Sequence, residues 1–233
     1  MKKNFVYLYI LVFLLNVTCI VFIWVGNPKD VLIFTKEDGL IESLSAIFYF
    51  LGIVCCLIAI SQKKFVIFSY LWLFLCVIFL GEETSWFQRN LNYSVPQIES
   101  INIQSEFNIH NLNIFHGSHL IDEQGYFQID FRKMLNAQNL FRIGLFFYFL
   151  ILPLAFRINK GKSLLIKIGY PNPSTLLVLS MWGAIILSIV LAFFSNSPIR
   201  SALAEIREML YALFIFFYIF SFAIPSNFLK RNG

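Results

Sequence analysis

The stretch FVIFSYLWLFLCVIFLGEETSWFQRN, from Phe65 to Asn90, decides the fold. Its first part, Phe65 to Leu80, is an apolar run without a charge and has nearly the length that a helix needs to cross a bilayer. Two adjacent carboxylates, Glu82 and Glu83, follow where this run would meet water. Carboxylates at such a depth are costly, so they mark a candidate functional site.

The composition of the whole chain is that of a membrane protein. Of its 233 residues, 58% are hydrophobic and 13% are charged, whereas a soluble domain usually carries about 25% charged residues. The net charge of +5 does not indicate a nucleic-acid partner, because in a multi-pass protein a basic excess usually reports the cytoplasmic loops. The lipid bilayer is the partner that the composition predicts, and the oligomeric state stays open.

Apolar runs long enough to form membrane-spanning helices recur along the chain. We expect six spans, at about 5–25, 40–60, 65–82, 140–156, 175–194 and 206–224. The sizeable polar segment is 84–139, between the third and fourth spans. The predicted fold class is therefore all-α, a polytopic membrane helix bundle that forms a single membrane domain over 1–233.

Six spans place both termini on one side of the membrane, and the basic residues indicate which side. With the termini in the cytoplasm, the inner face holds ten basic residues and no acid. The outer face then holds the other eight basic residues and all thirteen acids. The inner ten are Lys2, Lys3, Lys63, Lys64, Arg157, Lys160, Lys162, Lys167, Lys230 and Arg231. This distribution predicts cytoplasmic termini and an extracytoplasmic segment 84–139, which also contains all three histidines.

Carboxylates gather near the predicted outer ends of three spans. Glu42 enters the second span, Glu82 and Glu83 leave the third, and Glu205 and Glu208 enter the sixth. If the third helix continues past Gly81, then Glu82, Ser85 and Arg89 share one of its faces. In the outer segment, Glu106 and His110 have the i,i+4 spacing that places two ligands or an acid-base pair on one helical face.

These residues predict a site with assigned roles. Glu82, Glu83 and His110 are the candidate catalytic groups, while Arg89, Arg142 and Trp86 are candidates for binding substrate. A divalent metal is the candidate cofactor, and a mixed oxygen and nitrogen set suits zinc, manganese or iron. The candidate ligands are Glu42, Glu82, Glu83, Glu106, His110, Glu205 and Glu208. In the alternative interpretation, the acids lie at the headgroup level and pair with arginines, and Trp86 belongs to the interfacial aromatic belt.

The stretch GEETSWFQR at 81–89 is followed by the spaced residues Gln104, Glu106, Asn108 and His110, and then by Asn111 and Leu112. This pattern resembles one found in a family of uncharacterised polytopic bacterial inner-membrane proteins. The likeness covers about a quarter of the chain, and Phe87 stands where the pattern would have a glycine. The resemblance implies location in the inner (plasma) membrane and brings no activity with it.

The first functional hypothesis is an envelope enzyme whose outward-facing carboxylate and histidine site acts on a lipid or lipid-linked substrate. The alternative is a non-catalytic membrane protein, either a transporter or an envelope-assembly partner, in which the acids bind a cation or a proton. A transporter needs polar groups near the bilayer midplane, and the spans have few of them. The purely structural interpretation, with the acids paired to arginines and nothing bound, also stays open.

Overall fold

A computed structural model describes residues 3–35, 39–102, 105, 107–108, 112 and 137–224 of the chain. Within this part the regular secondary structure is helical, and the only extended pairing is an isolated bridge between Asn102 and Leu112. The predicted all-α class is confirmed. Contacts divide the chain into two compact units, 1–79 with 156–233, and 80–155. We call them unit 1 and unit 2.

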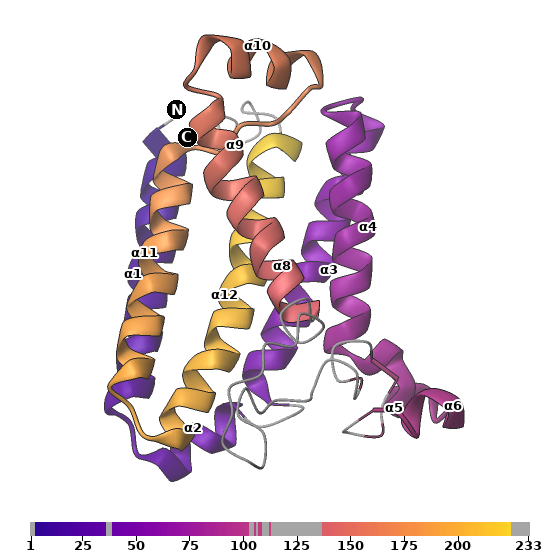
Figure 1. The fold of residues 1–233 in the computed structure, drawn as a ribbon, viewed down its shortest axis with the longest axis vertical. Helices are drawn as coiled ribbons and strands as arrows, with labels where there is room; N and C mark the ends of the chain where they lie inside the picture. Colours follow the sequence, from indigo (N-terminus) through magenta and orange to yellow (C-terminus); the bar gives the residue numbers. More distant parts are fainter. Residues whose placement is uncertain are drawn as a thin grey trace, which may run out of the picture. The chain divides into compact units, whose positions relative to one another are not determined.

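The long helices of unit 1 are built from the apolar runs. They are α1 (Lys3–Val25), α3 (Leu40–Ser61), α4 (Val66–Glu83), α11 (Thr175–Phe193) and α12 (Ser197–Ala223), and α4 continues into unit 2 at its last turn. Two shorter helices, α2 (Pro28–Thr35) and α10 (Asn159–Lys167), complete this unit. Figure 1 shows α1 and α11 side by side, and they are in contact.

Helix α12 is the centre of unit 1. It packs against α1, α2, α3 and α11, and its side chains are buried on several faces, among them Leu203, Leu210, Tyr218 and Ile219. The helix begins at Ser197, where Asn196 caps it by accepting a hydrogen bond from Ile199 N (3.2 Å), and it runs through nearly all of the predicted sixth span. A helix that is apolar on nearly all sides is expected at the centre of a bundle.

Close contacts between helices occur where side chains are small. A Cβ on Gly52 of α3 would lie 3.1 Å from Cys76 Sγ of α4, and one on Gly183 of α11 would lie 3.4 Å from the ring of Phe13 on α1. Small residues let membrane helices pack closely, because association in lipid depends on van der Waals contact. The buried cysteines therefore act as small packing residues here.

The surface of these helices is apolar as well. Large side chains such as Phe50, Ile67, Phe74, Leu179 and Ile186 are more than half exposed. Large exposed apolar side chains on several long helices are typical of contact with lipid. In the described part, four helical stretches are long and apolar enough to cross a membrane, namely Lys29–Ser61, Val66–Glu83, Thr175–Phe193 and Ser197–Ala223. The chain is thus a multi-pass membrane protein by length and composition.

A fifth span is added if Asn139–Ala155 and Asn159–Lys167 are counted as one broken span, and Asn16–Val25 of α1 is a shorter apolar stretch. The structure thus supports four to five spans. The count of six and the side of the termini remain predictions.

Unit 2 contains the last turn of α4, the 3-10 turn η1 (Ser85–Phe87), and the short helices α5 (Gln88–Leu91) and α6 (Pro96–Glu99). Its long element is α8 (Ala137–Phe146), which continues through a π-helical stretch η2 (Phe147–Ile151) into α9 (Leu152–Ala155). Pro153 explains the π-helical stretch. Proline has no N–H for Phe149 O, and its ring would clash with that carbonyl in a regular α-helix.

Candidate functional site

The chain leaves α4 through a backbone turn that side chains rarely adopt. Ser85, Trp86 and Phe87 have φ values of +44°, +53° and +62°. The left-handed region costs a non-glycine residue roughly 1–2 kcal/mol, so three in succession persist only if their surroundings hold them. Phe87 has a left-handed backbone that glycine adopts at much lower cost.

Trp86 is packed back against the last turn of α4. A Cβ on Gly81 would lie 2.7 Å from Cδ2 and Cε2 of the indole, so only glycine permits this contact. The indole Nε1 donates a hydrogen bond to Oε1 of Glu82 (3.0 Å). The indole also makes an edge contact with Phe107, with ring centroids 6.3 Å apart. Tyr93 Oη donates to the backbone oxygen of Trp86 (2.9 Å) and so fixes the turn itself.

Gln88 and Glu99 join the segments that follow the turn. Gln88 Oε1 accepts from Phe107 N (2.6 Å), while its Nε2 donates to Glu99 Oε1. Glu99 also accepts from Ser94 Oγ (2.7 Å) and from Val95 N (2.9 Å). The hydrogen bond from Ser94, followed by that from Val95 N, lowers the pKa of the Glu99 carboxyl below its usual value.

Two asparagines close this arrangement. Asn102 Nδ2 donates to both the backbone oxygen (2.9 Å) and Oδ1 (2.8 Å) of Asn108, and Asn108 Nδ2 lies 3.4 Å from Ser85 Oγ. Both asparagines are buried. We use the name polar cap for Glu82 and Glu83 together with the described residues between 84 and 112. The cap brings the two halves of the sequence pattern together, because Ser85 and Gln88 of the first half contact Asn108 and Phe107 of the second.

The structure brings some of the predicted site residues together. Glu82 and Glu83 lie in the last turn of α4 and are half-buried, and Trp86 binds Glu82 directly. The helix ends at Glu83, so Ser85 does not continue its face, and the expectation of a face shared by Glu82, Ser85 and Arg89 on one helix is wrong. The left-handed turn is the physical reason.

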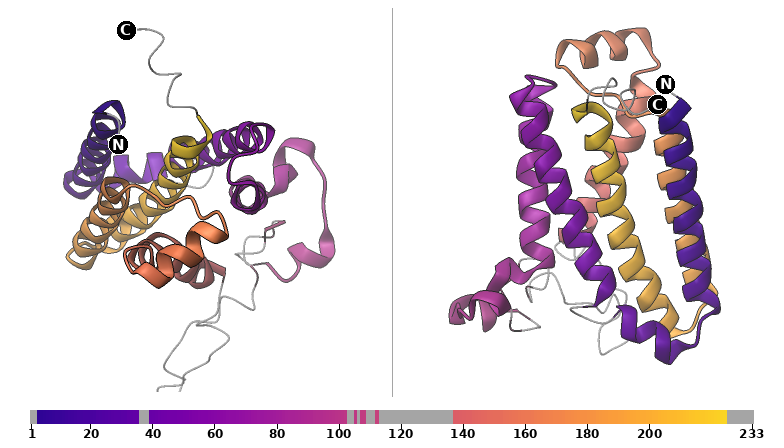
Figure 2. Two further views of the ribbon diagram at one scale, coloured as in Figure 1. Left: turned by 90° about the horizontal axis from the view of Figure 1, so that it is seen from above. Right: turned by 180° about the vertical axis from the view of Figure 1, so that it is seen from behind.

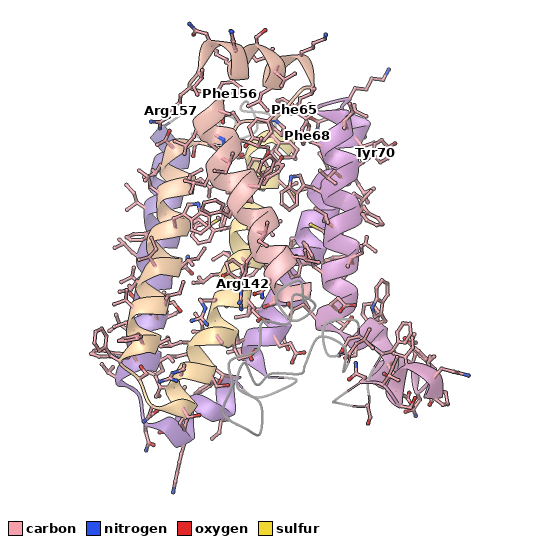
Figure 3. All side chains as sticks on the ribbon, in the orientation of Figure 1. Phe65, Phe68, Tyr70, Arg142, Phe156 and Arg157 are labelled. Carbon is pink, nitrogen blue, oxygen red and sulfur yellow. The ribbon has the colours of Figure 1, made fainter. Side chains whose placement is uncertain are left out.

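Of the other residues predicted for the site in unit 2, only Arg142 has a described side chain. Arg142 is exposed on α8, where its Nη1 lies 3.4 Å from Asn139 Oδ1 (Figure 3). The side chain of Arg89, together with Glu106 and His110, lies outside the described residues. Asn108 and Leu112, on either side of His110 in the chain, are described, and both pair with Asn102.

The remaining predicted ligands belong to unit 1. Glu42 lies in the first turn of α3, and Glu205 and Glu208 lie on α12, all half-buried and all with interaction partners. Between the two glutamates of α12, Arg207 Nη1 donates to Ser188 Oγ of α11 (3.3 Å). An arginine inside an apolar helix is expected to face a polar partner in this way.

Within the described residues, no group of three or more His, Cys, Asp or Glu side chains is arranged to hold a metal ion. That part of the chain includes five of the predicted ligands, namely Glu42, Glu82, Glu83, Glu205 and Glu208, and excludes Glu106 and His110. A metal centre made of the five glutamates alone is therefore not present. The prediction of a divalent metal depends on the histidine segment.

Several cap residues were not proposed as site residues from the sequence, in particular Ser85, Gln88, Tyr93, Glu99 and Asn108. Ser85, Gln88 and Asn108 belong to the recognised pattern, so the pattern itself was the available signal. The hydrogen bonds of Tyr93 and Glu99 depend on a turn that the sequence does not predict. Comparison of the chain with protein-family models, with curated proteins and with solved structures finds no match.

Proposed function

We propose that this protein is a multi-pass protein of the bacterial inner membrane, with six spans and cytoplasmic termini, whose polar cap binds the polar part of a lipid or lipid-linked envelope molecule at the outer face. The observation that carries the proposal is the left-handed turn Ser85–Phe87, which presses Trp86 against Glu82. Backbone strain of this kind collects at ligand-binding and catalytic sites. The strained turn thus holds the Glu82 carboxylate and the Trp86 ring in fixed positions, at a cost in folding free energy.

The proposed chemistry follows from the position of the acids. Glu82 and Glu83 end an apolar helix, where a carboxylate interacts strongly with a cation or an ammonium group because water is partly excluded. If the protein is an enzyme that acts on such a lipid, Glu82 or Glu83 acts as the general base or as a metal ligand, and His110 is the third catalytic group. Arg89 or Arg142 holds an anionic headgroup by charge-assisted hydrogen bonds.

A variant that removes only the charge of Glu82 tests this proposal. Glu82→Gln keeps an oxygen that accepts the Trp86 hydrogen bond, so the turn is retained while the carboxylate is lost. Asp30→Asn is the matched control, since Asp30 is an exposed acid on α2. Lipids that co-purify with the protein in detergent are identified by mass spectrometry, and bound metal is measured on the same samples.

We expect Glu82→Gln to lose a specific lipid species or bound metal that native protein and Asp30→Asn both retain. If all three proteins carry the same lipids and the same metal, Glu82 is not part of a binding site and the proposal fails. Glu83→Gln, measured in parallel, shows which of the two carboxylates contributes to the binding. A turnover assay follows only for a lipid that this comparison identifies.

Two observations favour the transporter alternative. Asn16 of α1 is 3% exposed within an apolar helix, and its Nδ2 has no hydrogen-bond partner. Ser188, which is fully buried, accepts from Arg207 within the same unit. Polar groups inside spans are typical of ion or proton pathways. A proton or cation flux through vesicles containing the purified protein, reduced by Arg207→Gln, would support this second function.

A further inference from the structure

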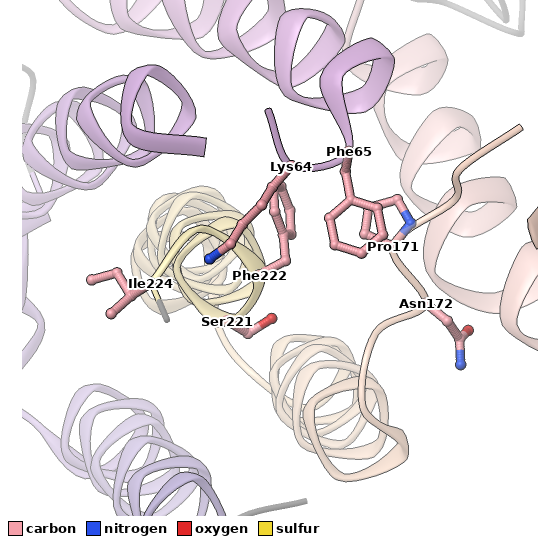
Figure 4. A pocket seen from close by; sticks show the side chains of 7 residues that line it. All are labelled: Lys64, Phe65, Pro171, Asn172, Ser221, Phe222 and Ile224. Carbon is pink, nitrogen blue, oxygen red and sulfur yellow. The ribbon is translucent and has the colours of Figure 1, made fainter. Parts of the chain in front are cut away.

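A pocket of about 500 Å³ opens in unit 1, where α3 ends and α4 begins. Figure 4 shows the side chains that line it, which come from three separate parts of the chain. They are Lys64 and Phe65 before α4, Pro171 and Asn172 before α11, and Ser221, Phe222 and Ile224 at the end of α12. The lining thus includes an ammonium group, an amide, a hydroxyl and apolar rings.

Lys64 supplies the charge of this pocket. Its Nζ donates one hydrogen bond to the backbone oxygen of Ala223 at the end of α12 (3.1 Å). An ammonium group has three donors, so the contact fixes the position of Nζ and leaves donors for a ligand. Phe65 packs edge-on against Phe222 with centroids 5.6 Å apart and closes the apolar wall.

The end of unit 1 around the pocket is strongly basic. Lys63 and Lys64 precede α4, and Arg157, Lys160, Lys162 and Lys167 lie on or beside α10, while segments 61–65 and 156–174 contain no Asp or Glu. Both segments meet at this end, because Tyr170 makes ring contacts with Phe68 of α4 (5.6 Å) and with Phe156 (6.5 Å). Figure 3 shows Phe65, Phe68, Phe156 and Arg157 together there. The pocket therefore attracts anions.

The surroundings of the pocket are suited to a membrane surface. Figures 1 and 2 show α10 lying crosswise at this end of unit 1, to one side of the long helices. Its Leu165 is buried, whereas Leu164 and Ile166 are about 60% exposed beside its lysines. An amphipathic helix with exposed apolar and basic side chains is typical of the lipid headgroup region. On α4, exposed Ile67, Leu71 and Phe74 form a stripe that begins within a turn of the pocket.

We infer that this pocket binds the phosphate headgroup of an anionic phospholipid, with Lys64 contacting the phosphate and the acyl chains lying along the apolar stripe of α4. In the proposed topology this is the cytoplasmic leaflet, where basic pockets between membrane helices bind anionic lipids. The pocket shares no residue with the polar cap. Its test therefore succeeds or fails independently of the function proposed for Glu82.

The experiment titrates the purified full-length protein with lipid and counts bound lipids by native mass spectrometry. Phosphatidylglycerol is the anionic probe, phosphatidylcholine the zwitterionic probe, and glycerol 3-phosphate the soluble source of the same phosphate chemistry. Lys64→Gln removes the charge, and Lys64→Arg restores it. Lys29→Gln on α2, an exposed lysine far from the pocket in the sequence, is the matched control.

We expect native protein to prefer phosphatidylglycerol to phosphatidylcholine, and Lys64→Gln to weaken phosphatidylglycerol binding about fivefold, since one basic residue near an anionic surface is worth about this factor. Lys64→Arg and Lys29→Gln should bind like native protein. Equal binding of the two lipids, or equal binding by Lys64→Gln and Lys29→Gln, overturns the inference. Competition by glycerol 3-phosphate at the concentration of the lipid also overturns it, because the site would then be one for soluble phosphate.

A second variant keeps the test decisive if Lys64→Gln disturbs the end of α12. Asn172 is exposed and lines the pocket, so Asn172→Asp adds a negative charge without changing shape or burial. We expect it to weaken phosphatidylglycerol binding several-fold and to leave phosphatidylcholine binding unchanged. Native-like phosphatidylglycerol binding by Asn172→Asp would contradict a phosphate at this position.

Discussion

The indole Nε1 of Trp86 donates a hydrogen bond of 3.0 Å to Oε1 of Glu82, four residues earlier in the chain. This is the spacing of two neighbours on one helix, but the helix has already ended at Glu83 and Trp86 has a left-handed backbone. The contact is therefore made by the chain turning back on the end of α4. The carboxylate at the end of the apolar helix and the strained turn form one structural unit.

Replacing Gly81 should separate these two residues. In Gly81→Ala the new Cβ meets the indole at 2.7 Å, so the ring must move and the Glu82 hydrogen bond is lost. Overpacking of this kind costs about 1–3 kcal/mol. Gly144→Ala on α8 is the control, because a Cβ there meets nothing within 4 Å and alanine favours a helix by roughly 0.5–1 kcal/mol.

The measurement for this pair is the thermal unfolding midpoint in detergent together with the rate of proteolysis within 84–112. Gly81→Ala should unfold earlier and be cleaved faster than native protein, while Gly144→Ala should unfold at the same temperature or later. Equal unfolding midpoints and cleavage rates in the two variants would mean that the position of the indole does not require a glycine at position 81.

Phe87 should tolerate glycine better than any neighbouring position. Its φ of +62° is unfavourable for a side chain, and its ring is 43% exposed, so Phe87→Gly removes strain and little packing. We expect the cap to be stabilised by about 1 kcal/mol. Leu91→Gly, at a 69% exposed position in α5, should instead destabilise it by roughly 0.5–1 kcal/mol.

Amide hydrogen exchange in the cap distinguishes these two outcomes. Protection of the amides of α5 and α6 should increase in Phe87→Gly and decrease in Leu91→Gly. Decreased protection in both variants would show that the left-handed conformation at Phe87 carries no strain to relieve.

Acid should open the cap through Glu99. Its hydrogen bonds with Ser94 and Val95 N lower its pKa below the unfolded-state value of 4.5. A depressed folded-state pKa contributes stability above the unfolded-state value, and this stability is lost as the pH falls through the lowered one. We therefore expect cap proteolysis to be constant at neutral pH and to rise in acid below about pH 4.5.

Glu99→Gln supplies the comparison for this acid response. The variant lacks the titrating carboxylate, so its cap should be cleaved faster at neutral pH and should lose most of the acid response. Asp30→Asn, outside the cap, should keep the native response. An acid response in Glu99→Gln as large as that of native protein would assign the transition to another group.

The helices were predictable because length and hydropathy alone determine where a chain can cross a bilayer. The apolar run after Phe65 became α4, and the run before Ile224 became α12, whose start at Ser197 follows from the asparagine cap. The number of spans was less predictable. Pro153 and the break before Asn159 leave the fourth run as several short helical pieces rather than one regular helix.

The candidate site was predictable in its residues but not in its geometry. Glu82, Glu83 and Trp86 stood out because acids and tryptophan are notable at the end of an apolar run. Their arrangement depends on three successive left-handed residues, which no local propensity favours. The partners Gln88 and Asn108 act across about twenty residues of chain, and a single sequence does not show which distant amide meets which backbone group.

Inside the membrane part, Ser188 should be the more sensitive of two buried serines on α11. Its Oγ accepts from Arg207 Nη1 (3.3 Å) and donates to Leu203 O (3.2 Å) on the neighbouring helix, so Ser188→Ala removes a hydrogen bond from a charged group. The expected loss is about 1–3 kcal/mol, because the guanidinium loses a partner in a low-dielectric environment.

Ser180→Ala is the control. Ser180 is 6% exposed but donates only to Leu176 O of its own helix (2.8 Å). Because alanine is the better helix former, Ser180→Ala should change stability by less than about 0.5 kcal/mol. Thermal unfolding of both variants in the same detergent measures the difference, and equal midpoints would mean that Arg207 draws no stability from α11.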